Sequence, residues 1–121
     1  MVDVYFVEAA ASDEAGSLDH KVEALYDALD IEAQIRQDSF VALKLHFGEK
    51  GNTGYIRPEW LSGLAARLTQ KTRRAFFTDT NTLYVGNRSN ASEHLKLAWE
   101  HGYSQEAVSY THLTLPTTPY V

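Results

Sequence analysis

The sequence of 121 residues contains no cysteine. Disulfides, thiolate nucleophiles and cysteine-ligated metals are therefore excluded from this chain, although the absence does not settle its compartment. Proline is also scarce, with three residues, two of them within 108–121. The remaining composition is that of an ordinary globular protein, 44% hydrophobic and 22% charged. The length suits one domain with one core.

The sequence also has fewer basic than acidic residues, and it has no long apolar run. Eleven lysine and arginine residues against sixteen aspartate and glutamate residues give a formal charge of −5. This balance disfavours a general surface for nucleic acid or anionic membranes, but it permits a local basic site. No apolar run approaches the ~18 residues that cross a bilayer, and the apolar stretch 4–7 lacks the basic leader of a secretory signal. We expect no nucleic-acid partner, no membrane partner and a cytoplasmic location.

Residues 108–121, VSYTHLTLPTTPYV, differ in kind from the rest of the chain. The string resembles a translated sequencing adapter; the alternative is a threonine-rich C-terminal extension. We expect 1–107 to be the N-terminal part of an α/β domain cut off in mid-gene, and 108–121 to be a non-native, adapter-derived tail. The alternation in THLTL (111–115) nevertheless permits a makeshift strand.

Strand and helix patterns alternate through residues 1–107. Runs of β-branched, aromatic and other apolar residues predict strands at 2–7, 40–47 and 75–78. A helix pattern follows each of them. The order β-α-β-α-β-α predicts an α/β fold with an open, mainly parallel sheet of three to four strands and flanking helices.

The helices are predicted from their caps and their apolar spacing. Ser17 would cap the first, whose inner positions are Leu18, Val22, Leu25 and Leu29. Asp30 would cap a short further turn over 31–35. Pro58 would open the second, whose inner stripe is Leu61, Leu64 and Leu68. Asn90 and Glu93 have capping-box spacing at the start of the third, which would end at Gly102.

The strand 40–47 becomes polar on one face near its carboxyl end. Ala42, Lys44 and His46 share that face, opposite Val41, Leu43, Leu45 and Phe47. In open α/β sheets, ligands bind outside the carboxyl ends of the strands. We therefore expect the loops 44–55 and 78–90 to share one edge of the sheet and to form the functional site there.

The first loop has the composition of an anion site. Gly48, Gly51 and Gly54 permit positive φ and close backbone approach, so that amide groups can point at an anion. Charge and a hydroxyl would come from Lys44, Lys50, Arg57 and Thr53. The order of a P-loop is absent. The alternative is a wide turn whose glycines only satisfy geometry.

His46 and Lys44 lie together at the polar end of this strand. His46 is a candidate general base, metal ligand or hydrogen-bonded core histidine. Lys44 would either position an anion or form an ion pair with Glu49 or Asp79, because an unpaired charge at a half-buried sheet edge is costly.

The second loop offers a carboxylate, an amide and a guanidinium. Asp79 would bind a hard cation, pair with Lys44 or orient His46, and Asn81 would hydrogen-bond a ligand carbonyl. The alternative for both is an Asx-turn after a strand. Arg88, near a helix N-terminus, suits bidentate binding of a carboxylate or phosphate.

Other conspicuous residues have simpler interpretations. Trp60 and Trp99 are predicted to be packing groups of helices. His20, His94 and His101 have no partner at metal-ligand spacing and are predicted to be surface or cap groups.

Two long blocks, KLHFGEKGNTGYIRPE (44–59) and TDTNTLYVGNRSNASEHL (78–95), resemble domain-of-unknown-function family 362, DUF362. Within it they are similar to the subgroup described as uncharacterised iron–sulfur centre proteins. The resemblance implies a longer protein with a ferredoxin-like cysteine segment that holds a 4Fe-4S cluster, and no such segment lies in this chain. The resemblance also implies that the signature loops of the family correspond to eleven positions of this chain, with no established role for any of them. They are Lys44, His46, Gly48, Glu49, Asn52, Thr53, Gly54, Asp79, Thr80, Asn81 and Tyr84.

Combining the residues with the resemblance gives three functional hypotheses. The first is an N-terminal fragment of a redox-linked iron–sulfur protein whose partner is a small anionic ligand or a redox protein. The second is a redox-silent enzyme or a phospho-ligand or metal-binding protein, and the third is a truncated chain without function. The predicted catalytic residues are His46 and Asp79, and the predicted ligand-binding residues are Lys44, Gly48, Asn52, Thr53, Gly54, Asn81 and Arg88. No metal ligand is assigned in this fragment.

Overall fold

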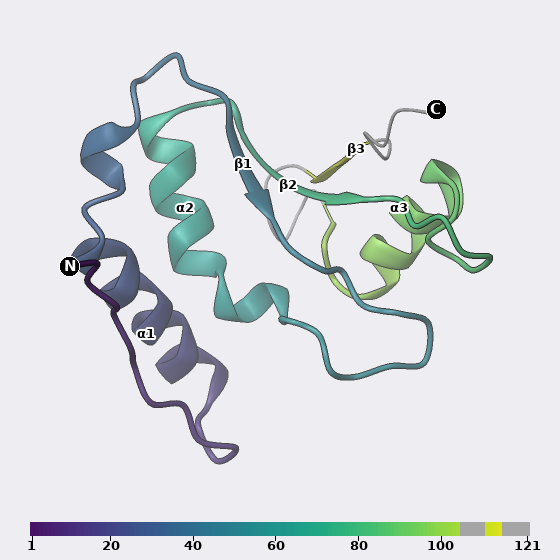
Figure 1. Cartoon of the computed structure of the whole chain (residues 1–121), viewed down its shortest axis with the longest axis horizontal. Coiled ribbons are helices and arrows are strands. Elements are labelled where there is room, and N and C mark those ends of the chain that lie inside the picture. Colours follow the sequence, from purple (N-terminus) through teal and green to yellow (C-terminus); the bar gives the residue numbers. More distant parts are fainter. Residues whose placement is uncertain (105–110, 115–121) are drawn as a thin grey trace. The chain divides into compact units, whose positions relative to one another are not determined.

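The computed structural model describes residues 1–104 and the strand 111–114 (Figure 1). These residues divide into two compact units. The first unit comprises 1–41 and 58–75, and the second comprises 42–57 and the described residues from 76 onward. Most of the predicted tail, 108–110 and 115–121, lies outside the described residues, so its adapter origin stays a prediction. Both loops of the predicted site belong to the second unit.

The first unit is built on two helices that lie side by side, α1 (Ala15–Ala28) and α2 (Ser62–Lys71) (Figure 1). Two short 3-10 turns accompany them, η1 (Glu32–Gln34) and η2 (Pro58–Trp60). Its buried apolar residues are Tyr26, Leu61, Leu64, Ala65 and Leu68. The predicted inner stripe of the second helix is therefore confirmed. Within residues 1–104, no helix combines the length and the apolar character needed to cross a bilayer.

The N-terminus of α2 is capped by a side chain from α1. Both carboxylate oxygens of Asp19 accept from the Gly63 amide, at 3.0 and 3.1 Å, and Oδ2 also accepts from the Ser62 hydroxyl at 3.0 Å. A negative charge there satisfies amides that have no partner inside the helix and matches the helix dipole. Pro58 thus opens the preceding 3-10 turn, and the helix itself begins four residues later.

Two predicted caps of the first unit are wrong. Helix α1 begins two residues before Ser17, with Glu14 at the N-cap position. The short turn predicted over 31–35 is present as η1, but Asp30 precedes it with a φ of 49° and contributes its carbonyl, which accepts from Gln34 at 3.5 Å.

The strand predicted at 2–7 is also wrong. These residues have no regular secondary structure, and Val2, Val4 and Phe6 are between 86% and 89% exposed. β-branched and aromatic residues fit a pleated, half-buried surface well, but a segment that contains them forms a strand only where a neighbouring strand is available to pair with it. Among the described residues, no strand pairs with this segment.

The sheet has three strands in the order β1-β2-β3: β1 (Val41–Lys44), β2 (Ala75–Thr80) and β3 (Thr111–Thr114) (Figure 1). It lies in the second unit apart from the first residues of β1 and β2. The amides of Val41 and Leu45 donate to the carbonyls of Arg74 and Thr78, each at 3.1 Å, so both partners advance by four residues in the same direction. β3 is parallel to β2, with Phe77 opposite Thr111. The predicted open, mainly parallel α/β fold is confirmed, including a strand within THLTL.

Aromatic side chains form the core of the second unit. Phe47, Phe77 and Tyr103 are 0–1% exposed, and the Tyr103 ring lies 4.9 Å from Phe47 and 5.6 Å from Phe77 between centroids. The hydroxyl of Tyr103 donates to the Ile56 carbonyl. This core supports the end of the 40–47 segment, whose alternation continues to Phe47 although β1 ends at Lys44. Trp99 does not join it: the prediction of a packing group is wrong, because this residue is 54% exposed.

Helix α3 (Ala91–Glu100) has both predicted ends. The Asn90 side chain accepts from the Glu93 amide at 3.0 Å, and Gly102 adopts a φ of 92° just beyond the C-cap His101. The N-cap orients the segment that runs from the site into the helix.

We expect Asn90→Ala to lower the free energy of unfolding by about 1 kcal/mol, because it removes a side-chain acceptor at an N-cap. Urea denaturation followed by circular dichroism measures the change. Asn90→Asp is the matched control, since it keeps an acceptor at the same place. An equal loss in both variants would show that the cap does not stabilise α3.

Candidate functional site

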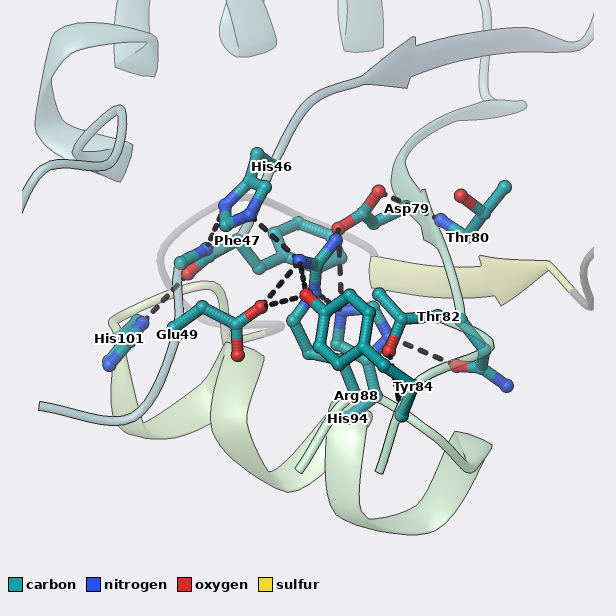
Figure 2. Close-up of polar contacts among 12 residues, drawn as sticks. His46, Phe47, Glu49, Asp79, Thr80, Thr82, Tyr84, Arg88, His94 and His101 are labelled. Carbon is teal, nitrogen blue, oxygen red and sulfur yellow. Dashed lines mark hydrogen bonds and ion pairs between the residues drawn. The ribbon is translucent and has the colours of Figure 1, made fainter. Parts of the chain in front are cut away.

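Arg88 lies at the centre of a polar cluster beyond the carboxyl ends of β1 and β2 (Figure 2). Its side chain is 7% exposed. The loop that carries it is closed by the Thr82 amide, which donates to the Arg88 carbonyl at 2.9 Å. This closure returns the chain toward the end of β2, so that the guanidinium meets side chains from both predicted loops.

The inner side of the guanidinium faces Asp79, which is 2% exposed. Arg88 Nη2 donates to Asp79 Oδ2 at 2.9 Å, while the Thr80 amide donates to Oδ1 at 2.8 Å and Lys44 Nζ lies 3.4 Å from Oδ1. Burial by itself raises the pKa of Asp79, but the hydrogen bond from His94, the Thr80 amide and the Arg88 charge together outweigh it. The pKa of Asp79 therefore lies well below its usual range, and the group is ionised at neutral pH.

The outer side of the guanidinium faces more exposed partners. Arg88 Nη1 lies 2.7 Å from Glu49 Oε1, 2.8 Å from His46 Nε2 and 3.2 Å from the Tyr84 hydroxyl. Nη1 carries two hydrogens, so it serves two of these acceptors at a time. The Tyr84 hydroxyl also donates to Glu49 Oε1. These hydrogen bonds from Tyr84 and Arg88 hold the pKa of Glu49 below its usual value.

His46 lies between two donors. The Gly48 amide donates to Nδ1 at 2.8 Å, and Arg88 Nη1 lies 2.8 Å from Nε2. A neutral imidazole has one lone-pair nitrogen and one N–H, so it accepts from one of these groups and not from both. The lone pair that a general base needs is therefore engaged by the chain itself in this arrangement.

His94 belongs to the cluster, and its prediction as a surface or cap group is wrong. It is 0% exposed, with Nδ1 lying 3.0 Å from Asn81 Oδ1. Its Nε2 lies 3.4 Å from both Arg88 Nε and Asp79 Oδ2. Nε2 therefore faces an acceptor and a donor at the same distance: with a proton on Nε2 the ring donates to Asp79, the contact that helps to lower the pKa of Asp79, and with a lone pair there it accepts from Arg88. The missed signal is helical spacing, because His94 shares the buried face of α3 with Leu97 and Ala98.

His20 and His101, the other two histidines of residues 1–104 that lie outside the loops, differ from each other. His101, at the C-cap of α3, contacts the Phe47 carbonyl through Nδ1 at 2.7 Å and stacks on the Tyr55 ring at 4.3 Å. His20, in the first unit, has a side chain that is 82% exposed, as predicted for a surface group.

The glycine loop makes contacts within itself. The Gly48 amide donates to His46, and the Gly54 amide donates to the Asn52 side chain at 2.6 Å. Gly48 and Gly51 have φ values of 97° and 78°. A Cβ on Gly48 would lie 2.7 Å from His101 Nδ1, so this glycine is required by packing as well as by its φ. In this conformation the loop resembles the predicted alternative of a wide turn more than an amide cradle for an anion.

The structure brings together most, but not all, of the predicted site residues. Lys44 and Asp79 pair directly, His46 and Asp79 each contact Arg88, and Asn81 joins through His94. Asn52 and Gly54 contact each other instead, and Thr53 is exposed. The expected convergence of the two strand ends is present, while the roles assigned to these residues stay predictions.

Among residues 1–104, no group of three or more histidine, aspartate or glutamate side chains is arranged to hold a metal ion. In the Arg88 cluster, the guanidinium lies between Asp79, Glu49 and the imidazoles of His46 and His94, and its positive charge takes the place that a bound cation would have (Figure 2).

A family model described as domain of unknown function (DUF362) matches residues 41–115. The chain belongs to the DUF362 family. The match includes the whole Arg88 cluster and extends into the segment 108–121. Comparisons with curated proteins and with solved structures give no match.

We expect acidification to destabilise this DUF362 chain through Asp79. Because the folded pKa lies below the unfolded value of about 3.9, the stabilisation is complete above that value and is lost as the pH falls through the folded pKa. Asp79→Asn should lower the free energy of unfolding at pH 7 by about 2 kcal/mol, the scale of a charged hydrogen bond, and should flatten its dependence on pH below about 5. Urea denaturation across this range measures both effects.

Asp38→Asn is the matched control, because the Asp38 side chain is 75% exposed. The free energy of unfolding of Asp38→Asn should stay within about 0.5 kcal/mol of the wild-type value. If Asp79→Asn keeps the wild-type dependence on pH, the Asp79 ion pair is not a source of stability.

Proposed function

We propose that this DUF362 chain binds a small anion at the outer side of Arg88, as the ligand-binding part of a redox-linked protein. The observation that carries the proposal is the asymmetry of the guanidinium. Its inner nitrogens face Asp79 and His94, which are almost fully buried, whereas Nη1 faces the partly exposed Glu49 and the exposed His46 and Tyr84. A ligand from solution would reach this outer side first.

The local charges favour an anion there. Arg88 and Lys44 share Asp79 as their inner carboxylate, and the Lys44 side chain is 60% exposed. The second positive charge is balanced by Glu49, which is 34% exposed, so an anion from solution can take the place of this carboxylate. Arginine in such a setting suits oxyanions, because its N–H groups form charge-assisted hydrogen bonds with them.

The 4Fe-4S cluster expected from the family resemblance does not fit residues of this chain. Cluster ligands are cysteine thiolates, and the sequence has none. The proposal therefore assigns the anion site alone to this chain and derives no step through a cluster. The cluster, the redox partner and the cytoplasmic location remain expectations from the sequence. An uninterrupted gene without a Cys-x-x-Cys-x-x-Cys pattern would contradict the redox-linked part.

The redox-silent alternative uses the same anion site. Asp79 is ionised and bonded to Arg88, Thr80 and Lys44, so it supports the guanidinium. Both hypotheses consequently depend on whether a small anion binds beside Arg88, and a binding measurement addresses the part they share.

We expect saturable shifts of the Gly48, Arg88 and Tyr84 amide signals when the chain is titrated with sodium acetate or inorganic phosphate at constant ionic strength, followed by ¹H–¹⁵N NMR. Lys44→Gln should weaken this binding about fivefold, since it removes one of the two cations that share Asp79 and leaves the cluster one unit more negative toward the anion.

Lys96→Gln is the matched control, because it removes an equal charge from an exposed position of α3. Equal affinities in the two variants, or linear shifts that never saturate, would contradict the anion site.

A further inference from the structure

Arg88 is bound by two carboxylates that differ in how firmly they are held. Asp79 is 2% exposed and accepts hydrogen bonds at both oxygens. The Glu49 side chain is 34% exposed, and Oε1 accepts from both Arg88 and Tyr84. Asp79 is thus a permanent partner of the guanidinium, whereas Glu49 can exchange with solvent.

We propose that the Glu49 carboxylate occupies the ligand-binding position beside Arg88 Nη1 and the Tyr84 hydroxyl. The ligand of this site is a small, singly charged carboxylate that displaces the Glu49 side chain from Arg88. The inference rests on the proposed anion site and names the chemical class of its ligand. Figure 2 shows the Glu49 carboxylate reaching toward Arg88 Nη1 and the Tyr84 hydroxyl. These two donors are already in place for a carboxylate oxygen, and an incoming carboxylate would take over both.

The segment that carries Glu49 permits such a displacement. A Cβ at Gly48 would lie 2.7 Å from His101 Nδ1 and 2.8 Å from Tyr55, so the chain is closely packed there, whereas a Cβ at Gly51 would meet no atom within 4 Å. Residues 50–54 are exposed, and both glycines have positive φ. Glycine reaches left-handed and right-handed backbone conformations with similar ease, so the loop beyond Glu49 can rearrange while Gly48 keeps its position against the core.

The charge of the site selects a single negative charge. The guanidinium that would bind the ligand already contacts the ionised Asp79 at 2.9 Å. Arg88, Lys44 and Asp79 leave one positive charge to be balanced once Glu49 is displaced, so a singly charged carboxylate replaces Glu49 one for one, whereas a doubly charged phosphate adds an excess negative charge beside Asp79. The available donors also suit one carboxylate oxygen, because Arg88 Nη1 and the Tyr84 hydroxyl both donate to the same atom, Glu49 Oε1.

The experiment compares wild type with Glu49→Gln by ¹H–¹⁵N NMR titration with sodium acetate. Removing the internal competitor should lower the dissociation constant for acetate about tenfold, as expected when a modest charge-assisted hydrogen bond no longer has to be broken. Glu100→Gln, at the exposed end of α3, removes an equal charge and should leave the constant unchanged. Glu49→Ala is a second variant that should also tighten acetate binding.

Parallel titrations with inorganic phosphate at pH 7.5 test the ligand class. Glu49→Gln should bind acetate more tightly than phosphate, and the reverse order would overturn the assignment to carboxylates. If wild type binds acetate but neither Glu49 variant binds it more tightly, the displacement is overturned while the anion site remains. If no anion gives saturable shifts in wild type or in either variant, both the anion site and the displacement are overturned.

Discussion

The buried ion pair between Arg88 and Asp79 is the interaction on which the second unit depends. Removing both charges from water is costly, and the attraction compensates only when the remaining hydrogen-bonding groups are satisfied. Here the Thr80 amide and Lys44 serve Asp79, while His94 and Glu49 serve Arg88. The pair therefore determines where the ends of β1 and β2, the loop before α3 and the first turns of α3 must lie.

Features encoded by local pattern could be predicted from the sequence. The stripe of Leu61, Leu64 and Leu68 follows from helical spacing, and the Asn90 cap follows from its distance to Glu93. The meeting of Lys44 with Asp79 follows from a topological rule, since parallel strands end at the same edge of a sheet. In each case the deciding information lies within a few residues or in the order of elements.

Features that depend on a distant partner could not be predicted in this way. The segment 2–7 has the composition of a strand, but pairing decides whether it becomes one. His94 looked like a surface group because its partners, Asn81 and Arg88, lie in a loop before its helix. The contact of Glu49 with Arg88 could not be inferred from composition either, because the sequence suggested Lys44 as a partner for this carboxylate. The Arg88 guanidinium occupies hydrogen-bonding positions of both carboxylates and both imidazoles, so the role of each of these side chains depends on Arg88.

The contacts of Arg88 link two roles that the sequence suggested separately, that of His46 as a general base and that of Arg88 as a ligand-binding residue. His46 was a candidate general base, yet its two ring nitrogens face the Gly48 amide and Arg88 Nη1. Nη1 also serves Glu49, so any acceptor that takes Nη1 away from its present partners changes the hydrogen bonding of His46 as well. The ring would then keep the Gly48 amide on Nδ1 and carry its proton on Nε2, directed toward the newly bound group. In the proposed complex His46 would donate a hydrogen bond to the bound anion, so the contacts of its ring favour a role in ligand recognition over that of a general base.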